Sequence, residues 1–225
     1  MKGILKFIGA THGRTVGRRR NYVLATHISE MLPAECRSLL DVGCGDGTIT
    51  WLVGQRRGNM RIEGVDVLVR PETMIPVTVF NGERLPQADG SLDVVSFIDV
   101  LHHIKNPSTM LREGWRVARL GILIKDHACP GRISRSILTF MDWIGNRPHG
   151  VSLLYNYWSQ GQWESAWRRL GLEISEKRTA LGLYPIWAGP IFDRRLHFMV
   201  FLSRIQDTNA SKNRIENPKN AHGSE

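Results

Sequence analysis

The feature that most constrains the fold of this chain is a cluster of three glycines between a short apolar run and a helical pattern. The apolar run, residues 38–42 (SLLDV), predicts a buried strand, and residues 48–55 predict the helix that follows it. Between them lies GCGDG, residues 43–47. Glycine lets a backbone approach a ligand closely, and a helix N-terminus offers free N–H groups. The sequence therefore predicts a strand–turn–helix unit whose turn can bind an anion or a dipole.

The rest of the sequence repeats this alternation of strands and helices. Further strands are predicted at residues 60–67, 77–80, 93–98, 119–125, 172–178 and 196–202, and further helices at residues 22–32, 107–117 and 158–170. Such alternation is typical of an α/β fold, in which helices cover both faces of a mostly parallel sheet. A chain of 225 residues with a hydrophobic content of 42% is long enough for one such domain.

The spacing of the glycines argues against a nicotinamide dinucleotide site. The dinucleotide pattern G-x-G-x-x-G would place its third glycine at position 48, where this chain has Thr48. The third glycine here is Gly47, and Asp41 stands two residues before the first one. A nicotinamide dehydrogenase is therefore the weakest of the functions that the turn permits.

Four segments in the same order resemble the motifs of one family. Residues 39–50 (LLDVGCGDGTIT) resemble the first motif of class I methyltransferases that depend on S-adenosylmethionine (SAM), in particular those that methylate small molecules and lipids. Residues 81–86 (NGERLP), 89–95 (DGSLDVV) and 99–104 (DVLHHI) resemble later motifs. The resemblance spans roughly residues 38–125 and returns at 157–172. It implies a Rossmann-like α/β fold with a seven-stranded, mostly parallel sheet, helices on both faces and an antiparallel last strand.

The resemblance also implies roles for individual residues. The first motif would hold the methionine part of SAM, and Asp66, which closes the second predicted strand, would grip both ribose hydroxyls. A carboxylate suits that task because its two oxygens can accept from two adjacent donors. Asn81 replaces the usual Asp of the adenine loop, so we expect a weaker contact there. Cys44 is expected to be a small packing residue. The complete set predicted to bind SAM is Asp41, Gly43, Cys44, Gly45, Gly47, Asp66, Val67, Asn81, Gly82, Glu83 and Asp99.

Methyl transfer from a sulfonium is an in-line displacement, so such an enzyme mainly aligns the acceptor and excludes water. A general base is needed only when the acceptor loses a proton. His127 is the first candidate, because it follows the fifth of the predicted parallel strands, at the edge where α/β sheets bind ligands. A solvated loop histidine is the alternative. The pair His102 and His103 could also act as acid and base, although the resemblance implies contact with the cofactor loop or a helix cap.

Three regions depart from the α/β pattern, two at the ends of the chain and one inserted in the domain. Residues 1–20 form a basic arm that carries six of the nine excess positive charges, and residues 21–203 form the methyltransferase domain. The arm could touch an anionic partner, such as lipid, a phosphorylated substrate or RNA, or it could be a flexible cap. Residues 127–158 would form an acceptor cap, whose aromatic side chains could wall the acceptor or pack as a lid. Residues 204–225 are polar and predicted to be disordered.

Several absences narrow the function further. The three cysteines lack metal-ligand or redox spacing, so no metal site is predicted and a reducing, cytoplasmic location is expected. No segment is long and apolar enough to span a membrane. The chain lacks the proline pair typical of methyltransferases acting on exocyclic amines. We therefore predict a SAM-dependent methyltransferase acting on a small-molecule or lipid acceptor. The alternative is an RNA- or membrane-docking protein of the same fold, such as a non-catalytic partner subunit. The acceptor and the oligomeric state stay open.

Overall fold

The computed structural model describes residues 2–129, 131, 135, 136, 138, 139, 155–184 and 196–204, with the backbone alone for residues 2–16. The predicted disordered tail is outside the described residues except for Arg204, whose backbone ends the last strand. Most of the predicted acceptor cap also lies outside them, including the aromatic residues Phe140 and Trp143.

Seven strands of the described chain form one sheet in the order β3-β2-β1-β4-β5-β7-β6. Their bounds are β1 (Ser38–Val42), β2 (Arg61–Asp66), β3 (Val77–Val79), β4 (Leu92–Ile98), β5 (Ala118–His127), β6 (Leu172–Arg178) and β7 (His197–Arg204). The pairs among β1 to β5 are parallel, whereas β7 runs antiparallel to both β5 and β6. This topology confirms the predicted fold class, including the antiparallel last strand.

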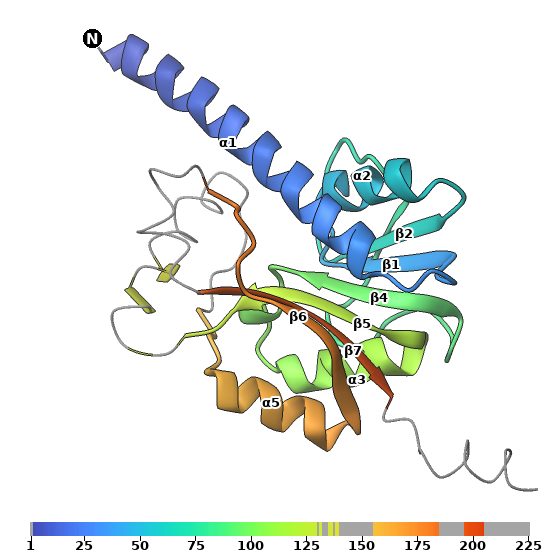
Figure 1. Cartoon of the computed structure of the whole chain (residues 1–225). Coiled ribbons are helices and arrows are strands. Elements are labelled where there is room, and N and C mark those ends of the chain that lie inside the picture. Colours follow the sequence, from blue (N-terminus) through green and yellow to red (C-terminus); the bar gives the residue numbers. More distant parts are fainter. Residues whose placement is uncertain are drawn as a thin grey trace, which may run out of the picture.

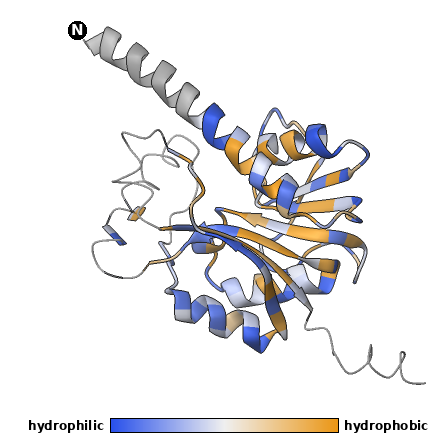
Figure 2. Cartoon of the chain, in the orientation of Figure 1, coloured by the Kyte–Doolittle hydropathy of each residue, from blue (hydrophilic) through white to orange (hydrophobic). Residues whose placement is uncertain are grey.

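Helices cover both faces of the sheet (Figure 1). The helices α1 (Lys2–Met31) and α2 (Thr48–Arg57) lie on one face, and α3 (Pro107–Val117) and α5 (Gln160–Arg169) lie on the other. Each face has its own core, one including Leu24 and Val53 and the other Leu111 and Trp163. Figure 2 shows the hydrophobic residues concentrated in the central strands, as expected for strands buried on both sides.

The first helix differs from its prediction. We expected a basic arm followed by a helix over residues 22–32, but one continuous helix runs from Lys2 to Met31. Proline is absent from this stretch, and its glycines weaken a helix without ending it. The helix docks through Leu24, Ala25 and Ile28, which are fully buried. None of the described helices is both long and apolar enough to cross a membrane.

The C-terminal end of α1 is held by one arginine of α2. The guanidinium of Arg57 donates to the carbonyl oxygens of Ser29 and Leu32, at 3.3 Å each, and of Pro33 at 2.6 Å. The last carbonyls of a helix have no partner within the helix, so a cation at this position satisfies them. This contact fixes α1 against α2.

The strand order places a crevice beside the glycine turn. The order reverses between β1 and β4, because the chain adds β2 and β3 on one side and then returns to add β4 and β5 on the other. In open α/β sheets, ligands bind at this reversal, outside the carboxyl ends of the strands. The loops after β1, β2 and β4 therefore surround the expected site.

Replacing Arg57 by Met should destabilise the protein by about 2 kcal/mol, because hydrogen bonds from a charged donor are lost and buried carbonyls lose their partner. Urea unfolding measures this change. The matched control is Arg61→Met, since Arg61 pairs with Glu63 while its side chain is 70% exposed. That variant should lose less than about 0.5 kcal/mol. Equal losses in the two variants would show that Arg57 does not anchor α1.

Candidate functional site

The glycine turn after β1 is shaped by contacts that exclude side chains. Gly43 has a φ of 71°, and a Cβ there would lie 2.3 Å from Cγ2 of Val100. Gly45 has a φ of 60°, yet a Cβ on it would meet no atom within 4 Å. Glycine is thus required at position 43 by packing within the protein, whereas at position 45 it leaves open space in front of the turn.

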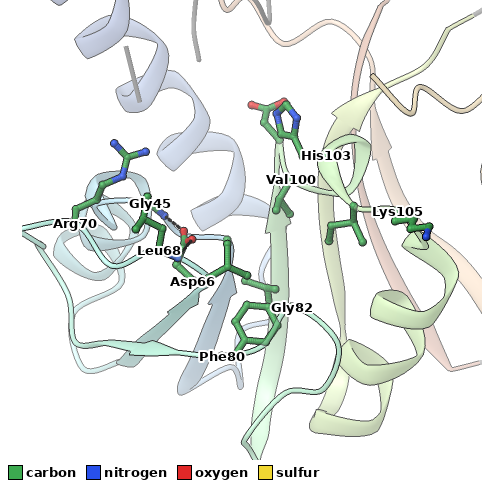
Figure 3. Close-up of a pocket in the computed structure, with 14 residues that line it drawn as sticks. Gly45, Asp66, Leu68, Arg70, Phe80, Gly82, Val100, His103 and Lys105 are labelled. Carbon is green, nitrogen blue, oxygen red and sulfur yellow. Dashed lines mark hydrogen bonds between the residues drawn. The ribbon is translucent and has the colours of Figure 1, made fainter. Parts of the chain in front are cut away.

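That open space belongs to a pocket of about 520 Å³ at the carboxyl ends of β1, β2 and β4. Such a volume is typical of small-molecule and cofactor sites. The described residues that line it are Val42, Gly43, Gly45, Asp66, Val67, Leu68, Arg70, Phe80, Gly82, Asp99, Val100, His103, Ile104 and Lys105. Figure 3 shows Asp66, Leu68 and Arg70 on one side and Val100, His103 and Lys105 on the other.

Six of the residues predicted to bind a cofactor line this pocket, namely Gly43, Gly45, Asp66, Val67, Gly82 and Asp99. Five others, Asp41, Cys44, Gly47, Asn81 and Glu83, are not among its lining residues. The turn, the end of β2 and the end of β4 are therefore brought together at one pocket.

Asp66 links two walls of the pocket. One oxygen of its carboxylate accepts from the backbone N–H of Gly45 at 2.8 Å, and the other accepts from the N–H of Leu68 at 3.1 Å. An ionised carboxylate has about four acceptor positions, so about two are left for a ligand. The predicted contact with two sugar hydroxyls is compatible with this geometry.

Asp41 lies one layer below the pocket. It is 3% exposed, and its carboxyl group accepts from the hydroxyls of Thr50 at 3.1 Å and Ser96 at 3.0 Å. Burial raises the pKa of Asp41 to about 7 despite these hydrogen bonds, because the charged form is poorly solvated there. Asp41 thus joins β1 to α2 and β4 under the turn, and its predicted contact with SAM stays a prediction.

The other predicted residues outside the pocket stabilise its loops. The side-chain oxygen of Asn81 accepts from the N–H groups of Glu83 at 2.9 Å and Arg84 at 3.0 Å, so it builds the turn after β3. The Sγ of Cys44 packs so close to Gly64 that a Cβ there would lie 2.5 Å away. The expected packing role of Cys44 fits this contact, and burial raises the pKa of its thiol, which disfavours a nucleophilic thiolate.

Sequence reasoning missed several lining residues, and of those named below only Ile104 lies in one of the four motif segments. Leu68 and Arg70 follow Asp66 in the loop after β2, and Phe80 directly follows β3. Ile104 and Lys105 close the segment that follows β4. Their position in the sequence could have identified them, because each of these residues lies in a segment that follows the carboxyl end of a parallel strand.

An ionic cluster lies at the edge of the pocket around Asp99. The carboxylate of Asp99 contacts both the ammonium of Lys125, on β5, and the guanidinium of Arg20, on α1. Burial alone would raise the pKa of Asp99, but these two cations outweigh it and hold that pKa well below its usual value. Asp99 also has a left-handed backbone with a φ of 53°. One cation of the predicted basic arm thus reaches the edge of the pocket.

The predicted base, His127, belongs to a second buried cluster around Asp126. Asp126 is fully buried and accepts from His102 Nδ1 at 2.7 Å, from the N–H of Leu101 at 3.1 Å and from the N–H of His127 at 2.7 Å. The ring Nδ1 of His127 lies 3.9 Å from the Asp99 carboxylate. Burial and the nearby Lys125 lower the pKa of His127, which keeps its ring neutral. His127 is 5% exposed and is not among the described residues that line the pocket.

His102, Asp126 and His127 also have the chemistry of metal ligands, and one atom from each lies within 4.8 Å of the others. Asp126, however, already accepts three hydrogen bonds, and the ammonium of Lys125 contacts Asp99 beside His127. A divalent cation would have to displace those bonds next to a buried positive charge. We therefore interpret the cluster as a hydrogen-bonded network.

Two described aromatic residues of the predicted acceptor cap pack into the domain. The ring of Tyr157 is 4% exposed and stacks on His102 with centroids 5.6 Å apart. Trp158 packs against Trp163 with centroids 4.9 Å apart. The sequence allowed two roles for the aromatic residues of the cap, contact with the acceptor or packing. The contacts of Tyr157 and Trp158 fit packing.

The raised pKa of Asp41 predicts a pH-dependent stability. Between about pH 4 and pH 7 the folded protein binds a proton at Asp41 that the unfolded chain releases, so this group makes stability fall as pH rises. Asp41→Asn removes the effect, and Thr50 can accept from the new amide while it still donates to the carbonyl of Gly47.

Urea unfolding should therefore show Asp41→Asn gaining stability relative to the wild type by up to about 4 kcal/mol between pH 4.5 and pH 8. The control is Asp89→Asn, because the side chain of Asp89 is 80% exposed and lies away from the turn. A difference between Asp41→Asn and the wild type that stays constant with pH would contradict a raised pKa.

Comparisons with known proteins agree with this architecture. The chain matches a family described as a methyltransferase domain over residues 16–177. No curated protein matches it. Among solved structures, it is 18% identical to a methyltransferase in a complex with the Haloferax volcanii activator Trm112, with a TM-score of 0.61 over 87% of this chain and 95% of that one.

Two further solved structures share the fold. Geranyl diphosphate methyltransferase in complex with SAM is 13% identical, with a TM-score of 0.62 over 82% of this chain and 85% of that one. A SAM-dependent methyltransferase of Thermotoga maritima is 16% identical, with a TM-score of 0.57 over 91% of this chain and its own full length. Since the family match covers more than half of the chain and the sheet has the same class of architecture, this protein belongs to the class I SAM-dependent methyltransferases.

Proposed function

We propose that this enzyme transfers the methyl group of SAM to a small-molecule or lipid acceptor. The observation that carries the proposal is the open space in front of Gly45, which faces the carboxylate of Asp66 within one pocket. A side chain at position 45 would occupy that space. Backbone and carboxylate groups at this position suit a ligand that combines sugar hydroxyls with an amino-acid end.

SAM supplies a methyl group that is already activated on a sulfonium, so the chain's own work is binding, alignment and exclusion of water. We assign the ribose hydroxyls to Asp66, as the sequence predicted. The apolar side chains of Val67, Leu68 and Phe80 line the same pocket and would flank the adenine. The acceptor would then approach from the side of Val100 and His103, across the pocket from Asp66.

The contacts of the basic segment, residues 1–20, also favour a small acceptor. They argue against the alternative in which this segment docks the protein on RNA or on a membrane. Arg20 pairs with Asp99, and Arg19 donates to the carbonyl of Gly182 at 3.5 Å. Both cations therefore have partners within the chain, which leaves fewer of them for RNA or for a membrane surface. The predicted base His127 is 5% exposed and is not among the described residues that line the pocket, so direct contact with an acceptor is not supported for it.

The test is transfer of label from [methyl-³H]SAM in a cell extract that has been separated into small molecules, lipids, RNA and protein. We expect the purified enzyme to label the small-molecule or the lipid fraction. Asp66→Ala, which lacks the sugar-binding carboxylate, is the matched inactive control. Label that appears only in RNA or protein would contradict the proposed acceptor class. Label in no fraction, with normal SAM binding, would favour a non-catalytic subunit.

A further inference from the structure

The side of the pocket across from Asp66 carries the polar groups that an acceptor would meet. Val100, His103, Ile104 and Lys105 come from the segment after β4, and Figure 3 shows Val100, His103 and Lys105 on that side. His103 provides the only imidazole among the described residues that line the pocket. Imidazole is the side chain best suited to exchange a proton near neutral pH.

The turn that carries His103 is anchored to β5. It is the 3₁₀ helix η1 (Leu101–His103), closed by a hydrogen bond of 2.9 Å from the N–H of His103 to the carbonyl of Val100. The buried carboxylate of Asp126 accepts from both Leu101 and His102. The ring of His102 packs against that of His103 with centroids 4.0 Å apart. The imidazole of His103 is therefore supported by a fixed scaffold, as a reacting group requires.

The other polar groups near this wall are poorer bases. Asp99 is paired with Arg20 and Lys125, whose charges hold its pKa well below the usual value. His127 is neutral, but it is 5% exposed and is not among the described residues that line the pocket. Lys105 is exposed on the same wall as His103 and brings a positive charge there.

These charges also bear on the chemical class of the acceptor. The only carboxylate among the described residues on this wall, Asp99, is already neutralised by two cations, so nothing there would hold an ammonium group. Lys105 lines the same wall and adds to its positive charge, and Figure 3 shows its ammonium group directed away from His103. The wall therefore favours an acceptor that reacts through an acidic hydroxyl.

We propose that His103 is the general base that deprotonates a hydroxyl acceptor, such as a phenol or an enol. This inference rests on the proposed function. The acceptor oxygen forms a bond to the methyl carbon while the carbon–sulfur bond breaks and its electron pair stays on sulfur, which leaves S-adenosylhomocysteine. The proton of the hydroxyl passes to the ring of His103 and from there to solvent. Asp126 and His102 hold the turn, and His127, outside the pocket lining, does not touch the acceptor.

A footprint with diethylpyrocarbonate tests the placement of His103 without any acceptor. The reagent modifies accessible neutral imidazoles, and peptide mass spectrometry reads each site in the full-length protein. We expect His103 to react and to be protected about tenfold by saturating S-adenosylhomocysteine. His27 is the control, because it lies on α1 and contacts Leu181 and Arg178 away from the pocket, so its rate should not change. An unreactive or unprotected His103 would overturn the proposal.

Turnover of a panel of simple phenols, with matched primary amines and thiols, tests the chemistry. We expect phenols to be the preferred acceptors and His103→Ala to lower kcat about a hundredfold while SAM binds as in the wild type. Added imidazole should restore part of that rate, as it would for a missing base. The comparison variant His127→Ala should not respond to imidazole.

If added imidazole restored the rate of His127→Ala and not that of His103→Ala, the base would be His127. A normal kcat for His103→Ala would also show that His103 is not the base. Preference for amines or thiols, or no turnover of any phenol, would overturn the hydroxyl assignment. Calorimetry separates these outcomes from failure of the proposed function. A wild-type protein that does not bind SAM contradicts the function itself, whereas normal SAM binding with unaffected His103 variants contradicts only this inference.

Discussion

The hydrogen bond of 2.8 Å from the N–H of Gly45 to Asp66 is the contact on which the site depends. It joins the glycine turn after β1 to the end of β2, so that two loops separated in sequence form one wall. The strand order makes this contact possible, because β1 and β2 are parallel neighbours whose carboxyl ends meet at the same edge. Asp41 supports the same turn from below through Thr50 and Ser96. A ligand in the pocket can therefore contact the backbone of Gly45 and the carboxylate of Asp66, both of which are held in fixed positions.

The parts of the fold that could be predicted are those that depend on local sequence patterns. Strands β1 and β6 were predicted with their observed bounds, and helix α3 begins at Pro107 as its position at a helix start suggested. The helix before β6 begins two residues later than expected, because Ser159 and Gln162 form a capping box. The family resemblance assigned Gly45, Asp66, Gly82 and Asp99 to one SAM site. In the structure these four residues line one pocket, since they follow the ends of neighbouring parallel strands.

The parts that could not be predicted depend on contacts between distant segments. Arg20 reaches Asp99 across 79 residues of sequence, and only the docking of α1 on the sheet brings them together. The burial of Asp41 depends on hydroxyls from α2 and β4, so its identity as an acid did not reveal which way it points. The sequence placed His127 ahead of His103 as a candidate base, because the burial of His127 depends on contacts that the sequence does not show. The structure separates them by placing only His103 on the pocket wall.

The central claim is that SAM rests against the bare backbone at Gly45, and a matched pair of variants tests it most directly. Gly45 and Gly90 have φ values of 60° and 57°, and a Cβ on either would meet no protein atom within 4 Å, but only Gly45 lines the pocket. Alanine therefore introduces similar backbone strain at both positions. Calorimetry should show that Gly45→Ala weakens SAM binding about tenfold or more, while Gly90→Ala binds as the wild type does. Unchanged SAM affinity in Gly45→Ala would contradict the account.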